Sequence, residues 1–75
     1  MNKKVEIFSK SNCPYCDMAK NFFDQKDIKY IEYNADNPDV FKKMLEMNPA
    51  ARTVPQIFID NKLIGGYTDL IEKYK

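Results

Sequence analysis

The 75-residue sequence contains no histidine and only two cysteines. Without histidine the chain has neither a Ser-His nor a Cys-His nucleophile pair, and it lacks a common zinc ligand. Two cysteines are too few for a small disulfide scaffold, and no further cysteine is present to complete a metal site within one chain. These absences make redox chemistry the first explanation for the two cysteines.

The sequence also lacks a long hydrophobic run and an excess of charge. No segment approaches the roughly 20 apolar residues of a membrane span, and the stretch from Val5 to Phe8 is interrupted by Glu6 and too short for a signal peptide. Lysine and arginine number 12 against 11 acidic residues, a net charge of +1 that gives no general attraction to nucleic acid. We therefore expect one domain over residues 1–75, a monomer in the reducing cytosol that binds neither membranes nor nucleic acid.

Hydrophobic spacing predicts alternating strands and helices. In order, the expected elements are a strand at Val5–Phe8, a helix from Pro14 to about Gln25, a strand at Ile28–Tyr33, a helix from Pro38 to Asn48, strands at Gln56–Ile59 and Lys62–Ile64, and a short helix capped by Thr68. The order is β-α-β-α-β-β-α. The helix between the first two strands makes them parallel, and the Asp60-Asn61 turn makes the last two a hairpin. We expect an α/β fold with a four-stranded mixed sheet and three helices.

The aromatic and aliphatic residues within these elements identify the expected hydrophobic core. It includes Phe22, Phe23, Phe41, Ile57 and Phe58. The lysines that are spread along the chain are expected to be solvated surface residues.

Both cysteines lie in the motif Cys13-Pro14-Tyr15-Cys16, at the expected start of the first helix. The free N–H groups and the dipole of a helix N-terminus stabilise an anion, so we expect a lowered pKa for the Cys13 thiol. Cys16 lies about one turn further on the same face, near enough for a disulfide but more shielded. This asymmetry predicts that Cys13 attacks and Cys16 resolves. Half of a zinc site shared by two chains, or chance spacing of two buried cysteines, are the alternatives.

Three motifs together resemble the glutaredoxin family. Cys13-Pro14-Tyr15-Cys16 resembles the dithiol active site, Thr53-Val54-Pro55 resembles the substrate loop, and the segment from Gly65 to Leu70 resembles the family's glycine-glycine turn and following helix. The motifs occur in the order that the family has. The resemblance implies the thioredoxin fold, a cis peptide bond before Pro55, and glutathione as reducing co-substrate, with no tightly bound cofactor and no metal.

The same resemblance implies a glutathione site. Its residues would be Lys10, Tyr15, Thr53, Val54, Pro55, Thr68 and Asp69. Lys10 would meet the glycine-end carboxylate of glutathione, Tyr15 would flank the sulfur, and Val54 would pair with the cysteinyl backbone. Plainer alternatives are a solvated lysine for Lys10, an ordinary strand start for Thr53, and a cover over the disulfide for Tyr15.

The γ-glutamyl end of glutathione would lie at the start of the last helix. Backbone N–H groups at Thr68 and Asp69 suit a carboxylate, and the Asp69 carboxylate suits the amine, although helix capping alone also explains an aspartate there. Lys42, Lys43 or Arg52 would supply a second cation.

The resemblance implies a glutathione-dependent thiol–disulfide oxidoreductase that reduces protein disulfides and glutathione mixed disulfides. A monothiol route would use Cys13 alone, and a dithiol route would also use Cys16. One alternative is a glutaredoxin-like hydrogen donor of ribonucleotide reductase that thioredoxin reductase reduces. Another is an iron–sulfur cluster module shared by two chains, although the Pro-Tyr pair between the cysteines resembles the dithiol enzymes.

Overall fold

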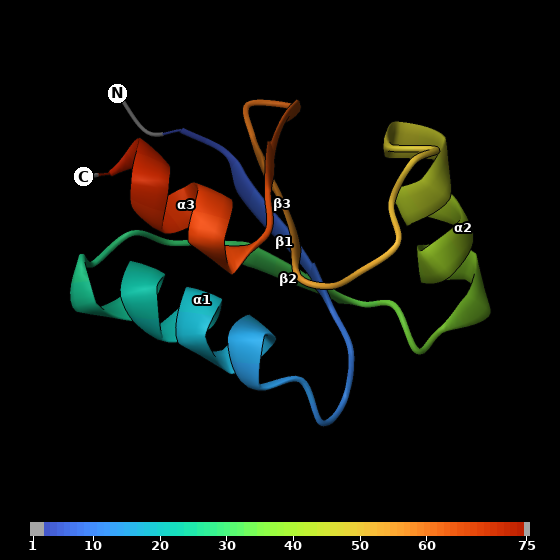
Figure 1. The fold of residues 1–75 in the computed structure, drawn as a ribbon, viewed down its shortest axis with the longest axis horizontal. Helices are drawn as coiled ribbons and strands as arrows, with labels where there is room; N and C mark the ends of the chain where they lie inside the picture. Colours follow the sequence, from blue (N-terminus) through green and yellow to red (C-terminus); the bar gives the residue numbers. More distant parts are fainter. Residues whose placement is uncertain (1–2, 75) are drawn as a thin grey trace.

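A four-stranded sheet with three helices forms the structure, a computed structural model that describes residues 3–74. The elements are β1 (Val5–Ser9), α1 (Pro14–Gln25), β2 (Ile31–Asn34), α2 (Pro38–Met47), β3 (Gln56–Ile59), β4 (Lys62–Gly65) and α3 (Tyr67–Lys73). Their order along the chain is the predicted β-α-β-α-β-β-α (Figure 1). Within the described residues, no helix is both long and apolar enough to cross a membrane.

The sheet is mixed, with its strands in the order β2-β1-β3-β4. β1 pairs in parallel with β2 and antiparallel with β3, and β3 pairs antiparallel with β4. Asp60 and Asn61 at the turn between β3 and β4 both have positive φ, 51° and 67°, which suits the right-handed twist of a tight hairpin. This arrangement is the four-stranded mixed sheet that the sequence predicted, and it is the thioredoxin fold that the family resemblance implied.

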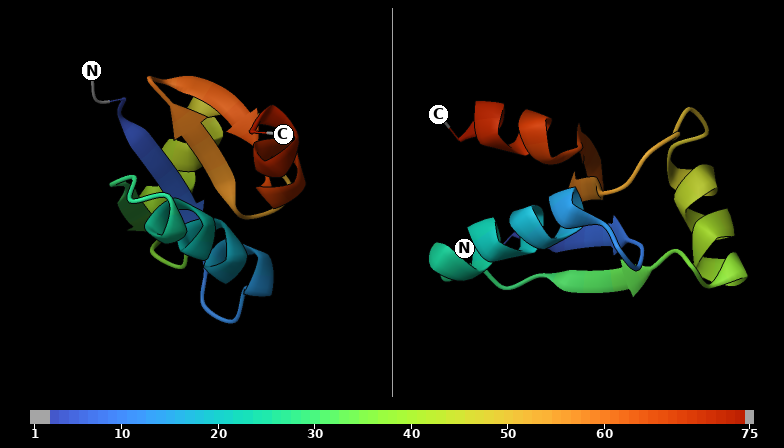
Figure 2. Two further views of the ribbon diagram at one scale, coloured as in Figure 1. Left: turned by 90° about the vertical axis from the view of Figure 1, so that its left-hand side faces the viewer. Right: turned by 60° about the horizontal axis from the view of Figure 1, so that its bottom comes forward.

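The two faces of the sheet carry separate clusters of buried residues, because successive strand residues point to opposite faces. One cluster joins the sheet to α1 and α3 and consists of Val5, Ile7, Ala19, Phe23, Ile57, Ile59 and Leu70. The other joins the sheet to the α2 side and consists of Phe8, Ala35, Met44 and Phe58. Figure 2 shows α2 set apart from the α1–α3 pair. Alternation along β1 therefore decides which helix each strand residue packs against.

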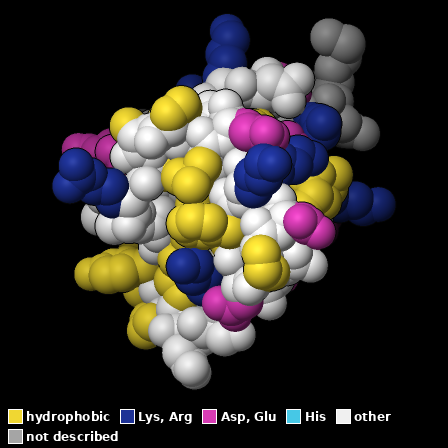
Figure 3. All heavy atoms as spheres, turned by 90° about the vertical axis from the view of Figure 1, so that its right-hand side faces the viewer, with side chains coloured by type: hydrophobic (Ala, Val, Ile, Leu, Met, Phe, Trp, Pro, Cys, Tyr) yellow, Lys and Arg dark blue, Asp and Glu magenta, His cyan; other side chains and the backbone are white. Residues whose placement is uncertain are grey.

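The structure corrects two of the core assignments. Phe41 is 37% exposed on α2, and Phe22 is only partly buried against the α1–α3 cluster. α2 stands alone on its side of the sheet, so only a narrow stripe of it is covered, and Met44 is its fully buried residue. Figure 3, which views this side, shows hydrophobic side chains exposed among basic ones.

The second strand begins later than the sequence predicts. β2 starts at Ile31, not at Ile28. The N–H of Ile28 donates to the carbonyl of Phe23, with an N···O distance of 2.9 Å. Because this bond closes the end of α1, the chain from Ile28 onward is held in the helix-to-strand connection and joins the sheet only afterwards.

The start of α3 also differs from the expected Thr68 cap. Gly66 is the N-cap, and the Asp69 carboxylate accepts a hydrogen bond from the Gly66 N–H at 2.9 Å. Thr68 therefore lies inside the first turn of the helix. The preceding Gly65 has φ +119°, and a Cβ there would collide with the Asp69 carboxylate. Only glycine fits this turn without strain.

Candidate active site

The Cys13–Cys16 pair lies at the N-terminus of α1, joined by a disulfide with a Cα–Cα distance of 5.2 Å. Cys13 is the N-cap, with extended backbone (φ −121°, ψ 95°), and Pro14 occupies the first helical turn, where its missing N–H is not needed. The backbone N–H of Cys16 donates to Cys13 Sγ at 3.1 Å. The sulfur of Cys13 therefore occupies the capping position, where the helix favours negative charge.

The two cysteines differ in accessibility, as the sequence predicted. Cys13 is half-buried, whereas Cys16 is 1% exposed and belongs to the buried interior. Cys13 is therefore the more accessible of the two to a substrate that approaches from solvent, whereas Cys16 is covered. The geometry therefore supports attack at Cys13 and a second, internal step at Cys16.

The loop before β3 faces the cysteines. The peptide bond between Val54 and Pro55 is cis, as the family resemblance implied. The Val54 carbonyl oxygen lies 3.7 Å from Cys13 Sγ, which places the backbone of the loop beside the reactive sulfur. An extended peptide bound there can pair with the Val54 backbone while its sulfur meets Cys13.

Two side chains that the sequence analysis missed hold this loop. Gln56 is 6% exposed, and its amide donates to the Thr53 carbonyl at 2.8 Å. The Asn48 amide, at the end of α2, in turn donates to Gln56 Oε1 at 3.0 Å. The available signal was a lone polar residue opening the otherwise apolar strand β3. Buried polar side chains of this kind are normally fully paired, and here they fix the loop to α2.

The N-terminus of α3 lies against the same loop. A Cβ on Gly66 would lie 3.6 Å from the Pro55 carbonyl oxygen. Across the site, the rings of Tyr15 and Tyr67 are 6.1 Å apart, and Tyr15 is 57% exposed. The exposed first turn of α3 therefore borders the cysteine site.

Lys10 lies on the other side of the loop, at a cavity of about 210 Å³. The cavity is lined by Lys10, Phe41, Met44, Ala51, Arg52, Thr53 and Val54. Of the three proposed second cations, Arg52 lies in this lining, whereas Lys43 lies over the Tyr33 ring at 4.8 Å from its centroid. Two cationic side chains thus converge on one cavity beside the Val54 backbone.

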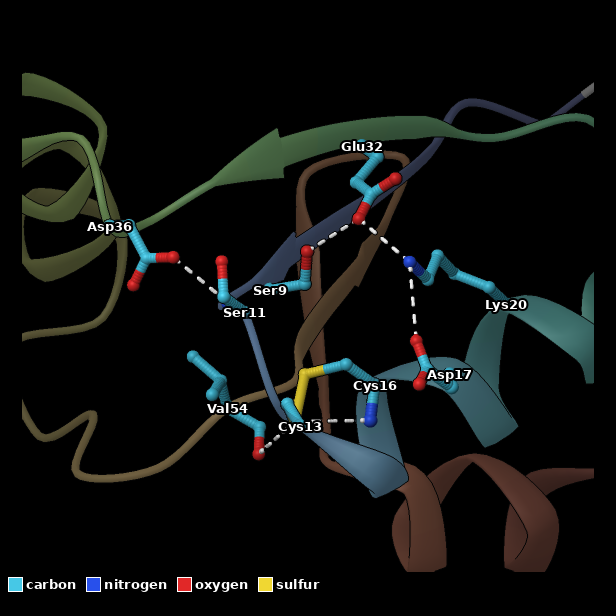
Figure 4. A network of polar contacts seen from close by, with 9 residues as sticks. All are labelled: Ser9, Ser11, Cys13, Cys16, Asp17, Lys20, Glu32, Asp36 and Val54. Carbon is cyan, nitrogen blue, oxygen red and sulfur yellow. Dashed lines mark hydrogen bonds and ion pairs between the residues drawn. A yellow bond between two sulfur atoms is a disulfide. The ribbon is translucent and has the colours of Figure 1, made fainter.

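A polar network behind the cysteines was also missed (Figure 4). Ser9 Oγ and Lys20 Nζ both donate to Glu32 Oε2, at 2.7 Å and 3.0 Å, and Lys20 Nζ lies 3.5 Å from Asp17. The hydrogen bond from Ser9, followed by that from Lys20, lowers the pKa of Glu32, while the bond to Glu32 raises the pKa of Lys20. The network connects α1 to β1 and β2 next to the cysteine motif.

A hydrogen bond to Asp36 holds the loop between β1 and Cys13 in place. The N–H of Ser11 donates to Asp36 Oδ2 at 2.9 Å, and hydrogen bonding by Ser11 lowers the pKa of Asp36. Asp36 is held in turn, because its N–H donates to Asn34 Oδ1 at 2.8 Å. The segment that leads into the active-site motif is therefore fixed to the end of β2.

Over residues 3–74, no group of three or more Cys, Asp or Glu side chains is placed to hold a metal ion.

A thioredoxin fold with two cysteines at the start of α1, facing a cis-proline loop, defines the class of thiol–disulfide oxidoreductases. Residues 5–64 match the glutaredoxin family model. The chain is 44% identical over 81 residues to glutaredoxin 1 of Rickettsia bellii, an alignment that covers 96% of this chain and 82% of that protein. The chain belongs to the glutaredoxin family.

Two further similarities show how the chain relates to other members. It is 40% identical over 81 residues to the mitochondrial glutaredoxin-2 of Bos taurus, covering 99% of this chain but only 49% of that protein. The chain therefore spans about half the length of the bovine relative. A crystal structure of a buckwheat glutaredoxin–glutathione complex superposes with a TM-score of 0.82 at 34% identity, over 96% of this chain and 68% of that chain.

Proposed function

We propose that this chain is a glutathione-dependent oxidoreductase that reduces protein disulfides and mixed disulfides between proteins and glutathione. The observation that carries the proposal is the position of Cys13. Its sulfur caps α1, accepts the Cys16 N–H at 3.1 Å and lies 3.7 Å from the Val54 carbonyl oxygen. The capping position stabilises a thiolate, and the adjacent loop offers backbone groups to a peptide.

In the monothiol route, the Cys13 thiolate attacks the glutathione sulfur of a mixed disulfide. A new disulfide forms between Cys13 and glutathione, and the protein thiolate leaves and takes a proton from water. A second glutathione thiolate then attacks the bound glutathione sulfur. This step releases glutathione disulfide and restores the Cys13 thiolate. One glutathione thiol is therefore oxidised for each protein thiol released, and the other half of the glutathione disulfide comes from the mixed disulfide.

In the dithiol route, Cys13 forms a mixed disulfide with a substrate protein, and Cys16 then attacks Cys13 Sγ. The substrate leaves with both of its cysteines reduced, and the Cys13–Cys16 disulfide remains. The disulfide present in the structure is the oxidised form that this route would produce. Two glutathione molecules would reduce it. Neither route requires a tightly bound cofactor.

The proposed glutathione site surrounds Cys13. Lys10 and Arg52 would meet the glycine-end carboxylate at their shared cavity, and Val54 would pair with the cysteinyl backbone beside Thr53 and Pro55. Two supports for this proposal are the solved glutathione complex of the buckwheat relative and the convergence of both cations beside the loop. All of these residues come from one chain, so we propose that a monomer is active, in a reducing compartment.

The other end of glutathione would lie at the start of α3. Thr68 and Asp69 are exposed there, and α3 begins beside the Pro55 carbonyl. One Asp69 oxygen holds the Gly66 N–H, so its other oxygen would take the amine of the γ-glutamyl group. Tyr15 would cover the sulfur of the ligand from the opposite side.

The first test is a glutathione-coupled assay on a small mixed disulfide with the wild type, Cys13→Ser and Cys16→Ser. We expect Cys13→Ser to lose at least about 100-fold in activity, because the nucleophile is absent. Cys16→Ser should retain the reaction, because the monothiol route does not use Cys16. Substantial turnover by Cys13→Ser, or complete loss in Cys16→Ser, would contradict the proposed roles.

A second arm of the same assay replaces glutathione with thioredoxin reductase. The proposal predicts turnover with glutathione and little with the reductase alone. The opposite result would favour the hydrogen-donor alternative. Visible absorption after anaerobic purification would instead favour the cluster-binding alternative.

A further inference from the structure

The ammonium group of Lys10 is held by an aromatic ring and has no acidic partner in contact. Its Nζ lies 4.9 Å from the centroid of the Phe41 ring. Within residues 3–74, the Lys10 side chain forms no ion pair and no hydrogen bond, although its charge also acts on Asp36 at longer range. A ring attracts a cation without neutralising its charge and without occupying its N–H donors as an acceptor would. The ammonium of Lys10 therefore remains available to an anionic ligand.

Phe41 is an unusual residue for its position. It lies on α2 about one turn before the buried Met44 and is 37% exposed, whereas the sequence pattern placed it in the core. Packing of the core therefore does not explain a large aromatic side chain here. The one ring interaction of Phe41 in the described structure is with Lys10, which gives the exposed ring a specific contact.

The backbone next to Lys10 is fixed from both sides. Ser9 is the last residue of β1 and pairs with Asn34 of β2, while the N–H of Ser11 donates to Asp36 Oδ2 at 2.9 Å. Lys10 therefore projects from a held segment. The remaining freedom of the residue is in its own four-carbon side chain, and the Phe41 ring restricts that freedom.

Lys10 and Phe41 also line one cavity, together with Arg52, Thr53 and Val54. The Val54 carbonyl oxygen is 3.7 Å from Cys13 Sγ, so the cavity begins beside the reactive sulfur. A ligand whose thiol lies at Cys13 and whose chain runs along Val54 would carry its next groups toward the Lys10 ammonium. Arg52 adds a second positive charge at the same cavity.

We propose that Phe41 is a positioning residue, which holds the Lys10 ammonium at this cavity so that it binds a carboxylate of the thiol co-substrate. The inference rests on the function proposed above and adds a residue that does not itself react or carry charge. Holding a lysine side chain in place before binding reduces the conformational entropy lost on binding. The effect should therefore appear in the affinity for carboxylate-bearing thiols and not in the chemical step.

A double-mutant cycle tests the inference, with KM for glutathione and kcat as the measured quantities. The variants are Phe41→Leu, Lys10→Met and the double variant. Phe41→Leu should raise KM about threefold with kcat unchanged, a change of the size that a surface cation–π contact gives. In the Lys10→Met background the same substitution should leave KM unchanged. Phe41→Tyr, which keeps the ring, should behave as the wild type.

Two controls isolate the role of the ring. Lys26 Nζ lies 5.2 Å from the Phe22 ring centroid, away from the cavity, so Lys26→Met removes a similar pair and should leave KM unchanged. An analogue of glutathione with its glycine-end carboxylate converted to an amide removes the proposed partner of Lys10. With this analogue, wild type and Phe41→Leu should have equal KM.

The outcomes separate this inference from the proposed function. If the wild type shows no Cys13-dependent turnover with glutathione, the proposed function fails. If turnover depends on Cys13 and Lys10→Met raises KM, but Phe41→Leu does not, only the inference fails. An equal rise in KM from Phe41→Leu in both Lys10 backgrounds would also overturn it, because Phe41 would then contact the ligand directly. A lowered kcat with a lowered melting temperature would mean a structural role and would overturn it too.

Discussion

At the scale of single residues, the reactivity proposed for Cys13 depends on backbone groups. Its sulfur caps α1 and accepts the Cys16 N–H, and the sequence offers no histidine to act as a base. Cys16 is 1% exposed, so its attack on a mixed disulfide at Cys13 is an intramolecular step between neighbours. The difference in burial within one four-residue motif is what separates the two proposed roles.

The adjacent glycines Gly65 and Gly66 should differ in how much an alanine substitution destabilises the protein. Gly65→Ala places a side chain at φ +119° and against the Asp69 carboxylate, so we expect a loss of about 2 kcal/mol in the free energy of unfolding. Gly66→Ala should cost less than about 1 kcal/mol, because its Cβ would make ordinary contacts with the Pro55 carbonyl oxygen at 3.6 Å and Asp69 Oδ2 at 4.0 Å. Urea unfolding of both variants measures the difference. Equal losses would contradict this explanation.

At the scale of elements, connections between neighbouring segments keep the site in place. The Ser9–Glu32–Lys20 network joins α1 to β1 and β2, and Gln56 with Asn48 joins the cis-proline loop to α2. Asp36 holds the loop before Cys13. Helix α1, the loop before it and the cis-proline loop are thus each tied to another element by a specific polar contact.

The Glu32 network predicts a pH dependence of stability. Hydrogen bonds from Ser9 and then Lys20 lower the pKa of Glu32 in the folded state. Its contribution is therefore fully present above the usual glutamate pKa of about 4.3, and it is lost as the pH falls through the lowered folded value. Because 40% of the Glu32 side chain is exposed, we expect Glu32→Gln to cost only about 0.5 kcal/mol at pH 7.

Urea unfolding at pH 7 and pH 3 tests this dependence. The difference between wild type and Glu32→Gln should shrink at pH 3, because this pH lies below the usual glutamate pKa of the unfolded chain and the charge no longer makes its full contribution. Glu46→Gln is the matched control, because Glu46 is exposed on α2 and forms no hydrogen bond or ion pair within the described residues. A Glu32→Gln difference that is as large at pH 3 as at pH 7 would argue against a role for the charge.

At the scale of the whole molecule, two clusters of buried residues on opposite faces of one sheet hold the fold together. The cluster under α1 and α3 supports the cysteine motif, while the one on the α2 side supports the cavity wall. A domain of this size has a total stability of roughly 4–11 kcal/mol. Loss of one large side chain from either cluster is therefore a large fraction of the total.

Substituting alanine for a phenylalanine inside these clusters should lower the free energy of unfolding much more than substituting one outside them. Phe23 is fully buried, so Phe23→Ala should cost about 3–5 kcal/mol through lost burial and a remaining cavity. Phe41→Ala should cost much less, about 1 kcal/mol, because 37% of Phe41 is exposed and its ring contact is with Lys10. Thermal or urea unfolding provides both values. Similar losses from the two substitutions would mean that Phe41 is a core residue after all.

Local patterns in the sequence were sufficient for the order of the elements. Pro14 and Pro38 marked helix starts, alternating apolar residues marked strands, and Asp60-Asn61 marked a hairpin. These features depend on neighbours within a few residues, so the chain itself specifies them. The start of β2 was wrong because a hydrogen bond from Ile28 back to Phe23, not the side-chain pattern, decides where the strand begins.

The cysteine motif and the family resemblance were also contained in the sequence. Spacing within one helical turn brings Cys13 and Cys16 together without help from distant parts of the chain. The residues that face this pair could not be predicted from local spacing. Val54 is 41 residues away from Cys13 and reaches it only because strands β1 and β3 are neighbours in the sheet. The resemblance implied the cis bond before Pro55, but the position of this loop beside the Cys13 sulfur follows from the tertiary fold.

The sequence by itself therefore determined the elements, the reactive pair and the family. Only the tertiary structure decided which polar residues from different elements meet, including the Ser9–Glu32–Lys20 network and the Asn48–Gln56 support of the loop. It also decided that Phe41 lies beside Lys10 at the surface. The physical reason is that α2 has one neighbouring face, so helical spacing alone cannot tell which of its apolar residues the sheet covers.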